Sequence, residues 1–428
     1  MSPLLLKTGI AGLAKAAAAV IAFVLTAIVA RTLGAAESGL FLFGFSLLSA
    51  LSIFFRLGLD NAILKYVGAE GISELAQKKL NTGLLWIVMT VVPFSCLSAL
   101  LSDPIAILIF NKPELASVIR WMMLALPFMS LFMLLAMGFQ GQHRVILTTI
   151  YQNLGLSTLF VVIITALIYA DKYNFLPLGL TWLDAHHFSM IYAFCALLVG
   201  LSGFAVWYSQ AGVSFSLGKL KDTELWAASS NLWVASIMSL AVVWSGVLIA
   251  GAFVSSEELA YLTAAQRTAT LTSFVLMVVN MVVAPRYAKL WRGGKVAQIQ
   301  KLAKWSTRAM ILMVLPVVLI MVLLPERVMS LFGKGFEQGA VLLAIMAIGQ
   351  FINVATGSVG YLLNMSGHER DFRRVTLFAG PLTIVLALVL TKLGGALGAA
   401  VATAIGLSVQ NLLALFMVKK RLGFWPIG

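Results

Sequence analysis

The chain is organised around the stretch Ile28–Gly68, which has the sequence IVARTLGAAESGLFLFGFSLLSALSIFFRLGLDNAILKYVG. This stretch predicts the outer end of one membrane helix, a tight turn at Gly34–Ser38, a second apolar helix and a polar exit. Each helix has the roughly 20 apolar residues that are needed to cross a bilayer. The segment Glu37–Phe41, an acidic residue leading to an aromatic one, has a counterpart at Glu257–Tyr261. We therefore expect two copies of one membrane module.

The composition supports a membrane protein along the whole chain. The 428 residues are 61% hydrophobic and 11% charged, and the mean hydropathy is +0.99. These values exclude an ordinary soluble globular protein. We expect an all-α polytopic protein of about twelve transmembrane helices. The predicted spans lie near residues 10–31, 39–59, 82–102, 117–139, 146–169, 188–209, 227–252, 261–284, 307–324, 339–364, 375–391 and 396–418.

The distribution of charge predicts the orientation of these spans. The net charge is +14, and the loops and helix ends on the predicted inner side hold 22 of the 30 Lys and Arg residues. This asymmetry follows the positive-inside rule and places both termini in the cytoplasm. It also accounts for the basic charge without a nucleic-acid partner. Cys96 and Cys195 both fall within predicted spans, so no disulfide is expected.

A second internal match indicates two halves of the chain. Gly141–Arg144 (GQHR) corresponds to Gly367–Arg370 (GHER), and both follow a Leu- and Met-rich span. The two pairs of matched segments have similar offsets, as a repeat of six spans requires. We predict an N-terminal six-helix lobe at 1–210, a cytoplasmic inter-lobe loop at 211–226 and a C-terminal six-helix lobe at 227–428. The loop at 65–81 is expected to form an amphipathic surface helix, and the basic loop Arg286–Arg308 is expected to face anionic lipid head groups.

Charges within or at the edge of predicted spans are the candidate functional residues. A charge at the centre of a membrane helix costs about 2.5–3.5 kcal/mol on insertion scales, so such groups usually face a cavity or a partner. Five cations and one anion qualify, and we predict that the cations bind substrate: Lys15, Arg31, Arg56, Arg120 and Arg267, with Asp60 as the anion. Snorkelling to the interface or a structural partner is the alternative for each cation, and Arg56 could simply pair with Asp60, four residues later.

Uncharged polar residues within the spans form a second group of candidates. Amides are suited to a sugar-accommodating lumen, but each alone is more often a hydrogen-bonding contact between helices. The polar-lumen candidates are Asn153, Gln266, Asn280 and Asn353.

We expect no catalytic residues, cofactor or metal. The sequence has no GxxxxGK[ST] phosphate loop. The histidine doublet at His186–His187 makes a poor metal site without a third ligand. The longest predicted outer connection, Asp171–His187, is too short to provide the polar surface of an enzyme that acts on sugars.

Four stretches together resemble a known family. They are ARTLGAAESGLFLFGFSLLSALSIFFRLGLDNAILKYVG, ELAYLTAAQRTATL, NMSGHERDFRR and GGALGAAVATAIG. They resemble Wzx-type polysaccharide (O-antigen repeat unit) flippases of the multidrug/oligosaccharidyl-lipid/polysaccharide (MOP) exporter superfamily. The resemblance implies two six-helix lobes around a central cavity. It also implies movement of undecaprenyl-diphosphate-linked oligosaccharide from the cytoplasmic to the periplasmic leaflet by alternating access.

The sequence interpretation is thus a bacterial inner-membrane flippase for lipid-linked sugar units, serving polysaccharide or lipopolysaccharide synthesis. Its expected partners are the lipid-linked oligosaccharide, membrane lipids, a polysaccharide polymerase and a chain-length regulator. One alternative is a MATE-like drug/cation antiporter, which should need buried carboxylates. The other is an integral membrane sugar polymerase or ligase, which the short outer loops disfavour.

Overall fold

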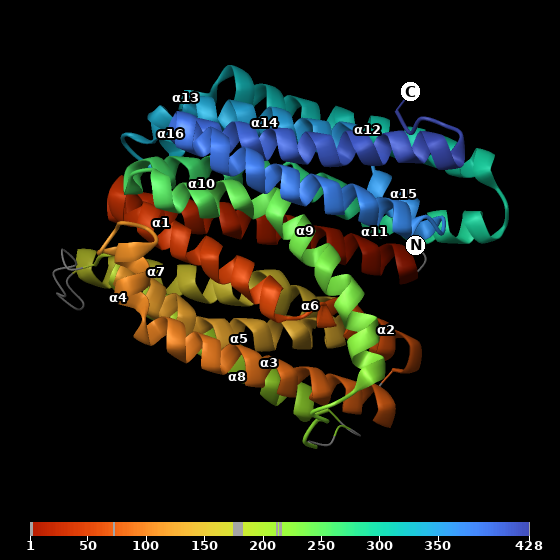
Figure 1. Ribbon diagram of the computed structural model, residues 1–428, viewed down its shortest axis with the longest axis horizontal. Helices are drawn as coiled ribbons and strands as arrows, with labels where there is room; N and C mark the ends of the chain where they lie inside the picture. Colours follow the sequence, from red (N-terminus) through yellow and green to blue (C-terminus); the bar gives the residue numbers. More distant parts are fainter. Residues whose placement is uncertain (1–2, 72, 174–182, 211–212, 214–215, 428) are drawn as a thin grey trace. The chain divides into compact units, whose positions relative to one another are not determined.

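The protein is all-helical. The computed structural model describes residues 3–71, 73–173, 183–210, 213 and 216–427, and these residues contain helices and turns but no strand. The chain divides into two compact units (Figure 1). We call Leu13–Ile237 the N-terminal unit, and Met1–Gly12 together with Met238–Gly428 the C-terminal unit. The division falls inside one long helix, α9 (Thr223–Phe253).

The N-terminal unit contains most of α1 (Pro3–Phe55) and the first part of α9. Side-chain caps begin two of its helices: Ser73 Oγ accepts from Ala76 N at 3.0 Å, and Asp184 Oδ1 accepts from His187 N at 3.0 Å. The other helices are α2 (Leu59–Glu70), α3 (Glu74–Leu100), α4 (Ser102–Leu108), α5 (Leu115–Gly141), α6 (Val145–Thr149), the π-helical turn η1 (Ile150–Leu154), α7 (Gly155–Lys172) and α8 (Ala185–Tyr208).

The C-terminal unit contains the remainder of α9 and a chain of interrupted helices. They are α10 (Ser256–Thr270), α11 (Ser273–Arg292), α12 (Val296–Leu323), α13 (Pro325–Met329), the 3₁₀ turns η3 (Ser330–Phe332) and η4 (Phe336–Gly339), α14 (Ala340–Ala355), α15 (Val359–Met365) and α16 (Glu369–Leu422).

The helices account for twelve membrane spans. Ten helical segments of the described chain are long and apolar enough to cross a membrane. The first and the last of these are each broken by glycine, at Gly34 (φ 75°) and at Gly395 (φ 55°). Glycine adopts positive φ without the steric penalty of a Cβ atom, so the chain changes direction at these positions. The prediction of about twelve membrane helices is confirmed.

Helices at equivalent positions of the sequence repeat occupy the centre of each unit. In the N-terminal unit α5, the fourth span, packs against α2, α3 and α8 (Figure 1). In the C-terminal unit α14, in the tenth span, packs against α10, α12 and α16. The matched turns that follow these spans each contain a residue with positive φ, His143 in GQHR and Gly367 in GHER.

Small residues allow close helix contacts, as expected where lipid provides no hydrophobic drive between helices. Gly349 of α14 faces Ala404 of α16, and a Cβ on Gly349 would lie 2.8 Å from the Ala404 Cα atom. Gly246 of α9 is packed in the same way against Thr403. These contacts bring α9, α14 and α16 together around the polar residues described below.

The predicted surface helix at 65–81 is wrong. The helix α2 ends at Glu70, Gly71 turns the chain with φ 65°, and α3 begins at Glu74. The first turns of α3 are largely buried, including Lys79, which has a partner in a distant segment. The predicted turn at Gly34–Ser38 is shorter than expected. Only Gly34 departs from helical geometry, and the residues on both sides of it are helical.

Candidate functional site

The eighth span is interrupted where the polar residues of the C-terminal unit collect. Helix α10 ends at Thr270 and α11 begins at Ser273. Thr268 Oγ1 donates to Ala264 O at 2.7 Å and Thr270 Oγ1 to Gln266 O at 2.7 Å, and such bonds back to the preceding turn bend helices. Broken helices at membrane depth are tolerated where protein or a cavity surrounds them, and in transporters they often mark the binding site.

An amide cluster lies at this interruption. Ser273 Oγ donates to Gln350 Oε1 at 2.6 Å. The Asn353 Nδ2 atom donates to Ser273 Oγ and to Gln350 Oε1, both at 3.3 Å. The cluster therefore joins the start of α11 to α14, and each amide retains atoms that can donate or accept further hydrogen bonds.

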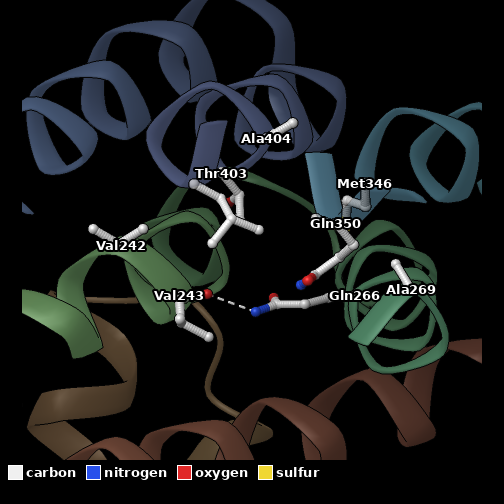
Figure 2. A pocket seen from close by; sticks show the side chains of 9 residues that line it. Val242, Val243, Gln266, Ala269, Met346, Gln350, Thr403 and Ala404 are labelled. Atoms are coloured by element: carbon white, nitrogen blue, oxygen red, sulfur yellow. Dashed lines mark hydrogen bonds between the residues drawn. The ribbon is translucent and has the colours of Figure 1, made fainter. Parts of the chain in front are cut away.

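Gln266 and Gln350 point into a small cavity beside this cluster (Figure 2). Gln266 Nε2 donates to Val243 O at 2.6 Å, while Gln266 Oε1 is buried and accepts no hydrogen bond from the described residues. The cavity volume is about 20 Å³, enough for a single water molecule. Its wall is uncharged: Val242, Val243, Gln266, Ala269, Met346, Gln350, Thr403, Ala404 and Leu407.

Arg267 follows Gln266 on α10 and is half-buried. It does not line the small cavity, because successive helix residues point in directions about 100° apart. Asn280, on α11, is buried, and its Oδ1 atom accepts no hydrogen bond within the described part of the chain. Thus the structure brings Gln266 and Asn353 close to the break in the eighth span, with Arg267 adjacent in sequence to Gln266.

The predicted cations of the N-terminal unit are not gathered at one point. Lys15 is half-buried and Arg31 is exposed, both on α1. Sixteen residues of helix between them correspond to about 24 Å along the axis. Arg120 on α5 is exposed and forms an ion pair with Asp103, with 2.8 Å between Nη2 and Oδ2. Asn153 is half-buried in the π-helical turn η1, where its Nδ2 atom lies 3.4 Å from Gln152 Oε1.

Arg56 is occupied at the corner between α1 and α2. Its Nε atom lies 2.9 and 2.8 Å from the two carboxylate oxygens of Asp60, and its Nη1 atom donates to Ser52 Oγ at 2.6 Å. The Arg56 side chain is only 10% exposed. The charge of Arg56 is therefore largely neutralised within the corner.

The sequence analysis did not predict a charged cluster that is centred on Lys79. Its ammonium Nζ lies 2.9 Å from Asp222 and 2.7 Å from Glu224, and Tyr66 OH donates to Glu224 at 3.0 Å. Lys79 is 6% exposed, although the sequence places it beside other lysines in a polar loop. Its partners are more than 140 residues away, so no local pattern could indicate the pairing.

The Asp222 cluster shifts the pKa of two groups outside the membrane spans. Burial acts to raise the pKa of Asp222, but bonds from Leu225 N and the Lys79 ammonium outweigh it and lower the pKa. Burial and the hydrogen bond to the Glu224 carboxylate raise the pKa of Tyr66. Asp222 is therefore held as a carboxylate at neutral pH.

Two family models match the chain. The model described as polysaccharide biosynthesis protein covers residues 4–291, and the MatE model covers residues 231–389. A curated relative is the probable low-salt glycan biosynthesis flippase Agl15 of Haloferax volcanii, which is 26% identical over 237 residues. These residues are 54% of this chain and 48% of the relative, so the match spans about half the length of the relative.

Solved structures share the fold. The lipid II flippase MurJ in an inward closed conformation aligns with a TM-score of 0.77 over 96% of this chain and 87% of that chain. An inward-facing multidrug resistance MATE family transporter of the MOP superfamily aligns with a TM-score of 0.66, over 95% and 94%. Sequence identity is 14% in both cases, so these similarities establish the fold alone.

Proposed function

The chain belongs to the polysaccharide biosynthesis protein family of the MOP superfamily and is a flippase-like membrane transporter, and from this we propose that its substrate is an oligosaccharide linked to undecaprenyl diphosphate. In this proposal the substrate moves from the cytoplasmic to the periplasmic leaflet by alternating access. The expected central cavity between the two six-helix lobes is part of the same proposal, as are the lobe boundaries at 1–210 and 227–428.

The observation that carries the proposal is the chemistry at the broken eighth span. Gln266, Gln350 and Asn353 offer both donors and acceptors to sugar hydroxyls, and Arg267 adds a cation one residue from Gln266. A diphosphate needs fixed cations, because charge-assisted hydrogen bonds are the strongest ones available to it. The small cavity holds only about one water, so a sugar requires the unit to open at this point.

Lys15 is the proposed counterpart in the N-terminal unit. Lys15 is chosen by its burial: it is half-buried on α1, whereas Arg56 is buried against Asp60, and Arg31 and Arg120 are exposed. We propose that Lys15 and Arg267 bind the diphosphate and that the exposed cations Arg31 and Arg120 act near the outer boundary.

A drug/cation antiporter is less well supported. Antiport of a cation requires a carboxylate that is free to exchange protons or cations. Asp60 is bound by Arg56, Glu224 by Lys79 and Asp371 by Arg421. The lining of the small cavity has no acidic residue. These three carboxylates are therefore poorly suited to exchange a proton or a cation.

Location and partners complete the proposal. We place the protein in a bacterial inner membrane with both termini in the cytoplasm, on the evidence of the positive-inside charge distribution. Reporter fusions after Gly294 should then report inside and fusions after Ser256 outside. The proposed role is transport without catalysis, in company with membrane lipids, a polysaccharide polymerase and a chain-length regulator.

Transport in proteoliposomes tests the substrate. A fluorescent undecaprenyl-diphosphate oligosaccharide should become accessible to a membrane-impermeant quencher only when the protein is present. The Lys15→Ala, Arg267→Ala double variant should lose this activity, while Arg267→Lys alone retains part of it, because the charge survives and the planar fork does not. Arg327→Ala, Lys334→Ala is the matched control, since both residues are exposed and the same charge is removed. Normal transport by the first double variant would refute the cationic site.

Sugar recognition can be separated from diphosphate recognition. Gln350→Leu replaces one amide of the cluster with an apolar side chain of similar size. We expect it to slow transport of the sugar-bearing lipid more than that of sugar-free undecaprenyl diphosphate. An equal effect on both lipids would assign Gln350 a purely structural role.

A further inference from the structure

A second, strongly basic cleft lies elsewhere in the C-terminal unit, between α11 and α12. Its volume is about 780 Å³. Four cations line it: Arg286 from α11, and Lys301, Lys304 and Arg308 from α12. Trp305 lines the same cleft.

The four cations have no anionic partner among the residues that the structure describes. The cleft lining has no Asp or Glu, and none of the four forms an ion pair with any described residue. Lys301, Lys304 and Arg308 lie three and seven residues apart, so they share a face of α12 and repel one another. An anion with several acceptor oxygens would relieve this repulsion.

An apolar face continues from the cleft along α12. Trp305 is 70% exposed, and Leu312 and Ile320 on the same face are 72% and 52% exposed. Tryptophan is typical of the interface between lipid tails and head groups. The cationic cleft therefore meets the interface, and an apolar strip leads from it toward the middle of the membrane.

We propose that this cleft binds the phosphate head group of an anionic phospholipid, whose acyl chains lie along the exposed face of α12. The combination of charge and apolar strip is the reason for choosing a lipid: a free phosphate would use the cations but leave the strip without a role. Juxtamembrane Lys and Arg clusters attract anionic lipid in this way. The proposal does not depend on which substrate the protein transports.

Binding to the purified full-length protein in detergent tests it. Phosphatidylglycerol should bind, counted by native mass spectrometry, and should raise the unfolding temperature. Phosphatidylcholine with the same acyl chains and inorganic phosphate should do neither. The Lys301→Gln, Lys304→Gln variant should bind phosphatidylglycerol roughly ten- to thirty-fold more weakly. Lys289→Gln, Arg292→Gln is the matched control, because both residues are exposed in the same basic segment and neither lines the cleft.

Three other results would overturn the proposed lipid site. Equal phosphatidylglycerol binding by the cleft variant and the control would overturn the site, as would stabilisation by inorganic phosphate alone. Displacement of phosphatidylglycerol by farnesyl diphosphate at equimolar concentration would also overturn it, by assigning the cleft to a polyprenyl diphosphate. If the lysine variant does not fold without lipid, Arg286→Gln, Arg308→Gln applies the same test with one cation from α11 and the remaining one from α12.

Discussion

The Nε atom of Arg56 lies 2.9 and 2.8 Å from the two carboxylate oxygens of Asp60, at the corner where α1 passes into α2. The corner turns through Leu57 (φ 52°) and Gly58 (φ 72°), and the α9 backbone at Trp233 packs directly on Gly58. Trp233 Nε1 also donates to Phe54 O at 2.7 Å. The ion pair thus closes a junction between three helices.

The main effect of Arg56→Ala should be a loss of stability, and any loss of transport should follow from it. Removing one member of a buried pair leaves the other charge uncompensated, which typically costs about 3–5 kcal/mol. Asp60 is partly exposed at 25%, so we expect the lower part of this range. Thermal unfolding in detergent and membrane abundance measure the loss.

A charge-free replacement provides the control. The Arg56→Met, Asp60→Leu double variant should recover most of the stability, because no charge is then stranded. Normal stability of Arg56→Ala combined with loss of transport would instead identify Arg56 as a substrate ligand.

Gly34→Ala should weaken the junction between the first two spans. Gly34 has φ 75° and ψ −178°, a conformation that is essentially restricted to glycine, and no other group lies within 4 Å of a Cβ placed there. The cost is therefore conformational, about 1–3 kcal/mol. Gly68→Ala is the matched control, since Gly68 is helical and equally open, and it should be neutral or stabilising. Equal stability of the two variants, measured by denaturant unfolding, would contradict this view of the kink.

Protonation of Asp222 at acid pH should break its ion pair with Lys79. The folded-state pKa of Asp222 is lowered, so its contribution to stability is present above the unfolded-state pKa and is lost as the pH falls through the folded-state value. We expect the unfolding temperature to fall below about pH 4, and Asp222→Asn to remove part of that dependence. Asp103→Asn is the control, because the Asp103–Arg120 pair is about half exposed on both sides. An unchanged acid profile for Asp222→Asn would contradict the prediction.

The fold was largely predictable because each span carries its own signal. A run of about 20 apolar residues must be helical in lipid, where backbone groups have no water to bond. Helix beginnings were less predictable. Helix α3 starts at Glu74 and α12 at Val296, because each helix continues into polar residues that hydropathy excludes from a span.

The sequence predicted which types of residue form the candidate site, but it did not predict which residues contact one another there. Gln266 and Asn353 were predicted as lumen candidates, but the sequence did not predict that Gln350 and Ser273 connect Asn353 to the broken span. The role of Lys79 was not predicted, because its partner Asp222 lies 143 residues later, directly before α9. Such contacts are set by tertiary packing, which a local pattern does not contain.

Membrane potential should drive the proposed transport. Moving a diphosphate outward from a negative interior gains roughly 2.3 kcal/mol per charge per 100 mV, or ~4–5 kcal/mol for two charges, if the protein's own cations do not travel with it. Initial rates in proteoliposomes should therefore rise with an inside-negative potential set by valinomycin and a potassium gradient, at constant pH on both sides.

The number of moving charges provides the control for this prediction. A matched polyprenyl monophosphate sugar carries less charge, so the logarithm of its transport rate should depend on voltage about half as steeply. A nigericin-imposed proton gradient without a potential should leave both rates unchanged. Equal voltage dependence for the two lipids would mean that the transported phosphate charge does not set the coupling. A rate that is independent of voltage would mean that Lys15 and Arg267 neutralise the head group and cross the field together with it.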